Sequence, residues 1–74
     1  MTTAIVESKR ADELRLGDRI AAHGKIRDVI GIIRNETDLF YGSRLLRIPA
    51  GSLTVHFVDS WAWYEPGELV EVHR

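Results

Sequence analysis

Turn-forming residues interrupt this sequence at short intervals. Glycine, proline, asparagine, aspartate and serine mark turns at residues 17–18, 23–24, 35–38, 42–43, 49–52, 59–60 and 66–67. The apolar or alternating segments between these turns are mostly shorter than the roughly 12 residues that a stable isolated helix needs. Short strands separated by turns at this spacing are typical of a small barrel or sandwich.

We therefore predict a mostly β fold, a small SH3-like barrel of about five to seven short antiparallel strands with at most one short helical turn. Closure into a barrel would leave few strand edges unpaired. The 74 residues are enough for one domain, residues 1–74, and no repeat or linker divides them. Residues 1–10 are expected to form either an edge strand, with 2–7 as its most strand-like part, or a flexible arm.

The first half of the chain holds one predicted helical turn and two predicted strands. Residues 11–16 have helical composition but cover less than two turns, so we expect a turn or a single 3₁₀ coil. Residues 19–22 are expected to form a short strand after Gly17-Asp18. Residues 25–34 form the longest predicted strand, because four isoleucines, one valine and a central glycine disfavour a helix.

This longest predicted strand does not alternate cleanly. Strict alternation would place Asp28 on the same face as Ile26 and Ile30, which spoils a core-facing surface. A bulge near Asp28–Ile30 would repair the pattern. Gly31 is expected to mark a bend where another strand crosses closely.

The second half of the chain carries two predicted hairpins with a strand between them. The hairpins join 39–41 to 44–48 across Gly42-Ser43, and 61–64 to 68–72 around Pro66-Gly67. Between the hairpins, residues 53–58 alternate in the manner of a half-buried strand. The alternation places in the core Leu53, Val55, Phe57, Val70 and Val72.

The composition limits the classes of function. Ten Lys and Arg residues against 11 Asp and Glu give a net charge of −1, whereas a general nucleic-acid binder usually carries a clear basic excess. The absence of cysteine excludes disulfides and thiolate metal sites. No apolar run approaches the roughly 18 residues needed to cross a bilayer, and residues 1–10 lack the pattern of a secretory signal. We expect a cytoplasmic protein without membrane contact.

The sequence contains no clear catalytic, cofactor-binding or metal-binding pattern. The three histidines, His23, His56 and His73, lack the close spacing of a metal site. The serines lie in no nucleophile-elbow pattern, and residues 23–25 lack the glycine spacing of a phosphate-binding loop. We therefore predict no enzyme activity, no cofactor and no bound metal.

Aromatic residues are the strongest candidates for a functional surface. Trp61 and Trp63 lie two apart on a predicted strand, so both point to one face, with Ala62 and Tyr64 on the other. If Ala62 and Tyr64 pack inward, two exposed tryptophans suggest an interface; if the tryptophans pack inward, Tyr64 is the exposed aromatic. We favour one core tryptophan and one partly exposed tryptophan. The predicted contact residues are Trp61, Trp63, Tyr64, Phe40 and Tyr41.

Basic residues suggest an alternative surface, one for single-stranded nucleic acid. The candidate contacts are Lys25, Arg27, Arg34, Arg44 and Arg47. Beside Tyr41 or the tryptophans, these cations would combine phosphate contacts with base stacking. Pairing with the 11 acidic residues on a mixed surface is the simpler expectation for these side chains.

Two segments carry a resemblance to known proteins. Residues 11–20, ADELRLGDRI, have the form a-x-x-L-x-x-G-D-x-I, which opens many small β-barrels, and residues 64–72 read YEPGELVEV. Together they resemble small SH3-like β-barrel proteins of actinobacteria and their bacteriophages, over about residues 11–73. The resemblance implies a compact barrel without assigned chemistry, in the host cytoplasm if a phage encodes it.

The sequence therefore favours a non-enzymatic module that binds another protein or itself. Such a module is expected to be an accessory protein of a phage or an actinobacterium. An exposed sheet edge offers one route to a homodimer. The alternative is a small nucleic-acid-binding β-barrel, whose affinity would fall steeply with salt because phosphate contacts release counterions.

Overall fold

The computed structural model describes residues 6–42 and 46–74, which form nine strands and one 3₁₀ turn. In chain order the elements are β1 (Val6–Arg10), η1 (Ala11–Glu13), β2 (Arg19–Ala22), β3 (Lys25–Asp28), β4 (Gly31–Arg34), β5 (Leu39–Tyr41), β6 (Leu46–Ile48), β7 (Leu53–His56), β8 (Trp61–Tyr64) and β9 (Leu69–His73). All strand pairs are antiparallel. The predicted mostly β fold with one short helical turn is confirmed.

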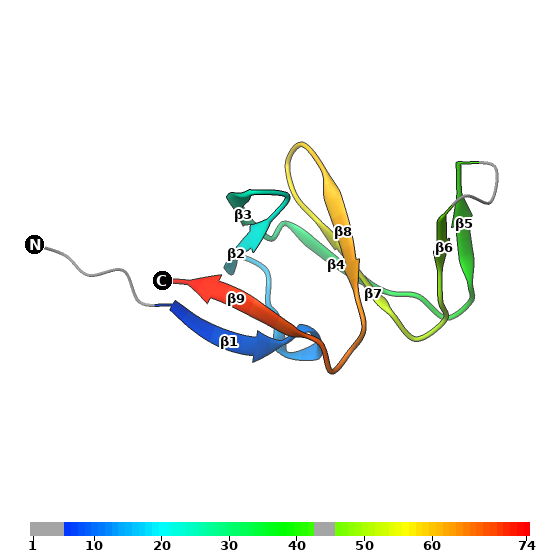
Figure 1. Ribbon diagram of the computed structural model, residues 1–74, viewed down its shortest axis with the longest axis horizontal. Helices are drawn as coiled ribbons and strands as arrows, with labels where there is room; N and C mark the ends of the chain where they lie inside the picture. Colours follow the sequence, from blue (N-terminus) through cyan, green and yellow to red (C-terminus); the bar gives the residue numbers. More distant parts are fainter. Residues whose placement is uncertain (1–5, 43–45) are drawn as a thin grey trace, which may run out of the picture.

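The strands form three sheets with the orders β1-β9-β2-β3, β4-β7-β8 and β5-β6. Figure 1 shows the first two sheets packed against each other, with the third at one end. Nine strands exceed the expected five to seven, in part because the predicted strand 25–34 is divided between two sheets. No ladder joins the three sheets within the described residues, so the expected closure into a barrel is not observed there.

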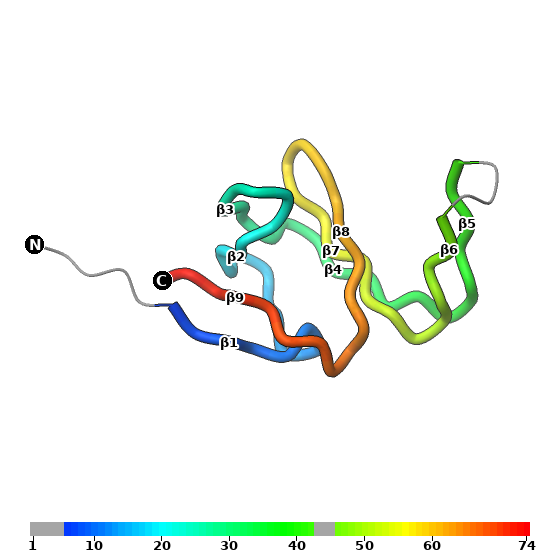
Figure 2. Tube along the Cα trace, in the orientation of Figure 1, coloured from blue at the N-terminus to red at the C-terminus, as the bar shows by residue number. Residues whose placement is uncertain are grey.

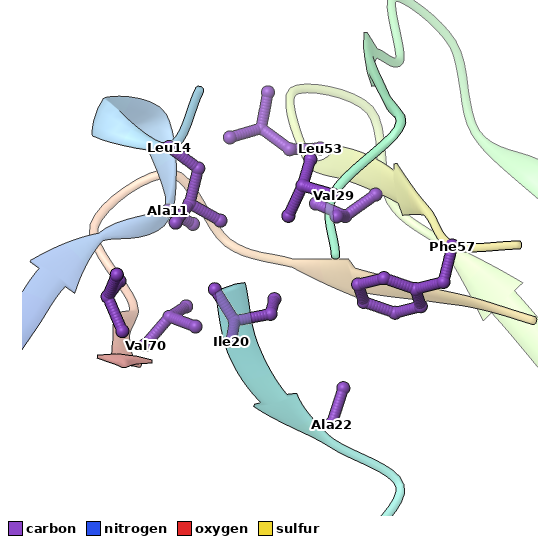
Figure 3. Close-up of a cluster of buried hydrophobic side chains, with 10 residues drawn as sticks. Ala11, Leu14, Ile20, Ala22, Val29, Leu53, Phe57 and Val70 are labelled. Atoms are coloured by element: carbon purple, nitrogen blue, oxygen red, sulfur yellow. The ribbon is translucent and has the colours of Figure 1, made fainter. Parts of the chain in front are cut away.

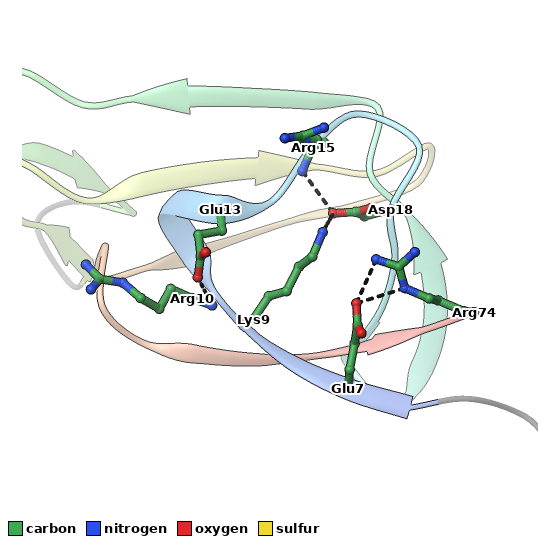
Figure 4. A network of polar contacts seen from close by, with 7 residues as sticks. All are labelled: Glu7, Lys9, Arg10, Glu13, Arg15, Asp18 and Arg74. Atoms are coloured by element: carbon green, nitrogen blue, oxygen red, sulfur yellow. Dashed lines mark hydrogen bonds and ion pairs between the residues drawn. The ribbon is translucent and has the colours of Figure 1, made fainter.

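Strand β1 lies at an edge of the first sheet and pairs only with β9 among the described strands. It spans residues 6–10, whereas the strand-like part was expected at 2–7; residues 1–5 lie outside the described part of the chain. The predicted 3₁₀ turn and the predicted strand at 19–22 are present as η1 and β2. An ion pair between Arg74 and Glu7 links the end of the chain to β1 (Figure 4).

The chain passes from the first sheet to the second at Val29, which is almost fully buried. The backbone N–H of Val29 donates to the Asp18 carbonyl at 2.8 Å, and its carbonyl accepts from the Gly17 N–H at 2.8 Å. The Asp18 carboxylate in turn accepts from the Arg15 N–H and from Lys9 Nζ, at 2.9 and 3.4 Å (Figure 4). Hydrogen bonds with Val29, Arg15 and Lys9 therefore fix the Gly17–Asp18 turn, which in turn fixes the position of Val29 between the sheets.

The predicted strand 25–34 is interrupted after this crossing, near the position where the sequence predicted a bulge. Gly31 pairs with His56, and the Ile30 N–H also donates to the His56 carbonyl, at 2.9 Å. His56 is therefore opposed by Gly31 and also bonded to Ile30, an arrangement that resembles a β-bulge at the start of β4. A Cβ atom on Gly31 would lie 3.4 Å from the Cβ of His56, so the expected close approach of a neighbouring strand is also present.

The predicted hairpin between residues 61–64 and 68–72 is wrong. Strand β8 pairs with β7, whereas β9 pairs with β1 and β2 in the other sheet. The turn around Pro66 closes with a hydrogen bond from the Glu68 N–H to the Glu65 carbonyl, at 3.0 Å, and carries the chain across between sheets (Figure 2). This path allows Val70 and Val72 to complete the core face of the first sheet.

The core lies between the first two sheets, whose apolar side chains meet in Figure 3. The buried cluster consists of Ala11, Leu14, Ile20, Ala22, Val29, Leu53, Val55, Phe57, Val70 and Val72. All five side chains that the alternation placed in the core belong to this cluster. Ile32, Ala62 and Tyr64 pack against it from the second sheet.

Shortening the side chain at the crossing point should destabilise the protein. We expect Val29→Ala to lower the free energy of unfolding by about 2 kcal/mol, because two buried methyl groups are lost and a cavity remains. The neighbouring Ile30 is more than half exposed, so Ile30→Ala should change the free energy by no more than about 0.5 kcal/mol. Urea unfolding of both variants measures the difference. Equal losses would contradict the assigned role of Val29.

Candidate interaction surface

Strands β5 and β6 form a hairpin, called here the outer hairpin, which stands apart from the two packed sheets (Figures 1 and 2). Its register pairs Leu39 with Ile48, Phe40 with Arg47 and Tyr41 with Leu46. The predicted hairpin is confirmed for these residues, whereas residues 43–45 lie outside the described part of the chain. Because an isolated two-stranded hairpin is marginally stable in water, the outer hairpin depends on what holds its base.

A buried polar cluster joins the base of the outer hairpin to the second sheet. Asn35 Nδ2 donates to Ser52 Oγ at 3.2 Å and to Thr54 Oγ1 at 2.8 Å, and Ser52 Oγ donates to the Pro49 carbonyl at 2.6 Å. Asn35, Ser52 and Thr54 are all buried. Buried polar groups are costly unless they are hydrogen-bonded, so these contacts favour one position of the connecting segments.

Asp38 forms a second set of polar contacts at the base of the outer hairpin. Its carboxylate accepts from the Ala50 N–H at 2.7 Å and forms an ion pair with Arg47 at 2.8 Å. The hydrogen bond from Ala50, followed by that from Arg47, lowers the pKa of the Asp38 carboxyl below its usual value. The charged carboxylate of Asp38 therefore links the start of the outer hairpin to Arg47 on β6 and to Ala50 in the segment that leads to β7.

The two tryptophans face away from the core. Ala62 and Tyr64 pack against the core cluster, so Trp61 and Trp63 occupy the opposite face of β8. The expectation of one core tryptophan is wrong, since both are half-buried and neither belongs to the core cluster. Trp61 instead lies against Tyr41 of the outer hairpin, with ring centroids 5.0 Å apart and planes tilted by 37°.

Tyr64, also a predicted contact residue, lies on the core side of β8. Burial raises the pKa of its hydroxyl, and the nearby Glu68 carboxylate raises it further. Its ring packs against the core cluster instead of joining the tryptophans. The structure therefore separates Tyr64 from the other four predicted contacts.

The remaining candidates lie on the outer hairpin, on both of its faces, and on the neighbouring strand β8. Phe40 is 55% exposed and lies on the opposite face of the hairpin from Tyr41. Tyr41 and Leu46 pair across the two strands, and both side chains are also exposed. We call the following five residues the aromatic surface: Phe40, Tyr41, Leu46, Trp61 and Trp63. Sequence reasoning missed Leu46, because the predicted turn at Gly42-Ser43 would pair Tyr41 with residue 44, whereas the observed register pairs Tyr41 with Leu46.

His23 also supports this region and was missed as a structural residue. It occupies the two-residue turn between β2 and β3 with a φ of 52°, and Gly24 follows with a φ of 77°. Its Nε2 donates to the Trp61 carbonyl at 2.8 Å, and its ring meets Phe57 edge-on at 6.5 Å. His23 thus connects the first sheet to β8. The His-Gly pair between two short predicted strands could have indicated this turn, because two-residue turns of this type need a positive φ at both positions.

The five basic candidates do not form one surface among the described residues. Arg27 forms an ion pair with Asp59, donates to the Ala22 carbonyl and leaves only 13% of its side chain exposed. The Asp59 pKa is lowered, chiefly by the hydrogen bond from Arg27. Arg47 is held by Asp38.

The other basic candidates are dispersed. Lys25 lies on β3 of the first sheet and Arg34 on β4 of the second. Neither forms an ion pair with any residue that the structure describes. Arg44 lies outside the described residues.

Neither a clustered metal site nor a similar known protein supplies a further indication of chemistry. Within residues 6–42 and 46–74, no three His, Asp or Glu side chains gather to hold a metal ion. The described part of the chain also contains no helix long and apolar enough to cross a bilayer. Comparisons with protein-family models, curated proteins and solved structures find no match to this chain.

The two aspartates with lowered pKa values predict how stability depends on pH. Each is more acidic in the folded chain than in the unfolded chain, so its stabilising contribution is present above about pH 4 and is lost as the pH falls through its folded pKa. We expect Asp38→Asn and Asp59→Asn to be less stable than the native chain at pH 7, with a gap that narrows below about pH 4. Urea unfolding between pH 7 and pH 3 measures this gap. A gap that stays constant or widens in acid would contradict the assignment.

Replacing the ring of His23 should weaken the contact between the sheets. Asparagine tolerates the positive φ of this turn but loses the packing on Phe57 and the hydrogen bond to Trp61. We expect His23→Asn to lower the free energy of unfolding by about 1 kcal/mol and to change tryptophan fluorescence. His73 lies on β9 away from the turn, so His73→Asn serves as the control. Unchanged stability and fluorescence in His23→Asn would show that the contacts of His23 with Trp61 and Phe57 do not stabilise the fold.

Proposed function

We propose that this protein is a non-enzymatic interaction module that binds another protein, or a second copy of itself, through the aromatic surface. The observation that carries the proposal is the exposure of Phe40, Tyr41 and Leu46 on the outer hairpin, which belongs to neither of the two packed sheets. These side chains contribute little to the core cluster. A partner that covers them would stabilise a hairpin that is otherwise held mainly at its base.

The energetics favour such a contact. Full burial of one large apolar side chain contributes roughly 1.5–3 kcal/mol, and aromatic residues are enriched among the side chains that dominate interfaces. Trp61 and Tyr41 already contact each other, so their rings are partly ordered before a partner arrives. Ordering in advance reduces the entropy lost on binding. The polar cluster around Asn35 adds to this by fixing the base of the hairpin.

A protein partner fits the charges of this region better than nucleic acid does. Arg47, which lies opposite Phe40 on the outer hairpin, is engaged by Asp38. The net charge of the whole chain is −1. Phosphate binding needs available cations beside the stacking rings. The resemblance to phage and actinobacterial barrels is consistent with an accessory protein that acts in the cytoplasm by assembly.

A comparison of two double variants tests the proposal. Phe40→Ala with Leu46→Ala removes apolar contacts from the outer hairpin, and Val58→Ala with Leu69→Ala removes two exposed apolar side chains elsewhere. Each tagged protein is used to capture partners from an actinobacterial lysate with and without nuclease treatment, and its own mass is measured by light scattering over a concentration series. We expect the outer-hairpin variant to lose at least about tenfold in capture or self-association, since two anchors contribute more than 1.4 kcal/mol. The control variant should behave like the native chain.

Three results would overturn the proposal. Equal binding by the two double variants would show that the aromatic surface is not the contact. Recovery that nuclease abolishes would favour nucleic acid. A native chain that captures no protein and remains monomeric at every concentration would show that it is not an interaction module.

A further inference from the structure

Strand β4 has an open edge in the second sheet, where the order is β4-β7-β8 and no described strand pairs with its other side. The Asn35 N–H, just after β4, donates to the carbonyl of Ser52, just before β7. Because these groups alternate in direction along a strand, the N–H groups at odd-numbered positions of β4 point toward β7. By the same alternation, the N–H and C=O groups of Ile32 and Arg34 point toward the open edge. These groups are available to a further strand.

Apolar side chains flank this edge. Ile33 is 54% exposed, and Ile30 and Leu16 are exposed beside it. Together with residues 14–15 and His56 they line a shallow, mainly apolar depression of about 640 Å³. Natural edge strands are usually protected by charges, prolines or covering segments, whereas β4 has the sequence Gly-Ile-Ile-Arg with a single charge.

We propose that β4 pairs antiparallel with β4 of a second copy, about a two-fold axis at Ile33. This inference goes beyond the proposed function, because it assigns self-association to the edge of β4 and not to the aromatic surface. Because Ile32 and Arg34 carry the outward hydrogen-bonding groups, each would pair with the other across the axis. Ile33 would then lie directly opposite Ile33 of the second copy and become buried.

The occupant is a second copy because this edge is complementary to itself. In the proposed register Arg34 lies opposite the apolar Ile32, and Glu36 lies opposite Ile30, so no two like charges are directly opposed. Shifting the axis to Arg34 would place the two arginines directly opposite each other. The bulge at Ile30–Gly31 lies outside the central pairs. Four residues on each side bury less area than a standard interface, so the dimer is weak and concentration-dependent.

A single cysteine provides a direct test, because the chain contains no native cysteine. The Cα atoms of a non-hydrogen-bonded antiparallel pair lie about 4.5 Å apart, within the roughly 4.4–6.8 Å that a disulfide spans. We expect Ile33→Cys to form a disulfide-linked dimer under mild oxidation at concentrations where the native chain associates. Val58→Cys is the control, since Val58 is 85% exposed and lies outside β4, in the turn between β7 and β8. Equal cross-linking of the two variants would indicate random collision and overturn the inference.

A proline substitution tests the backbone pairing independently. Arg34→Pro removes an N–H that points away from β7, so the β4–β7 ladder is retained while the proposed pairing loses a donor. Arg34→Ala removes the same side chain and keeps the N–H. Sedimentation equilibrium should show at least about a tenfold weaker dimer for Arg34→Pro than for Arg34→Ala, consistent with loss of more than 1.4 kcal/mol. Urea unfolding confirms that both variants are folded.

The outcomes separate this inference from the proposed function. A dimer that persists in Arg34→Pro but is lost in the Phe40→Ala, Leu46→Ala variant would overturn the edge pairing and support the aromatic surface. A monomer that still captures a protein partner through the aromatic surface would also overturn only the edge pairing. A chain that neither dimerises nor captures a protein would overturn both.

Discussion

The pair of backbone hydrogen bonds that Val29 makes with the Gly17–Asp18 turn determines how the two sheets meet. Gly17 reaches a φ of 90°, which an L-residue adopts with strain, and this allows the turn to close around the crossing chain. Val29 then places its side chain in the core while the bulge after it turns the chain into β4. Because β4 begins at this fixed point, its register with β7 is fixed, and so are the positions of β8 and the outer hairpin that follow from it.

The surface that we propose for binding is supported by polar contacts and by the buried Ile48 of β6, which lies outside the core cluster. Hydrogen bonds from Asn35 to Ser52 and Thr54 join the segments that lead into and out of the outer hairpin, and Asp38 joins the same segments through Ala50. His23 reaches from the first sheet to the carbonyl of Trp61. The core therefore provides stability, whereas the hydrogen bonds determine where the aromatic rings lie. Such a division leaves apolar side chains exposed without loosening the fold.

Local patterns in the sequence predicted the strands and much of the core. Alternation placed Leu53, Val55 and Phe57 correctly, and the mismatch at Asp28 indicated the bulge beside Gly31. Pairing between distant segments was harder to predict. A turn such as Pro66-Gly67 has the same composition whether the next strand pairs with the previous one or crosses to another sheet. Here β9 crosses to the first sheet, where Val70 and Val72 are buried, and the turn sequence does not encode this choice. The aromatic surface was predicted in part, but its central contact joins Tyr41 and Trp61 through tertiary packing, which no local pattern encodes.

Site-specific photo-cross-linking in cells is the most direct test of the proposal that the outer hairpin contacts a protein. A benzoyl-phenylalanine at position 40 replaces an exposed ring with one of similar shape, and the same group at Val58 reports contacts at a distant exposed position. We expect from this proposal a discrete cross-linked protein, either a partner or a second copy, from position 40 and none from position 58. No product from position 40, or the same products from both positions, would contradict it.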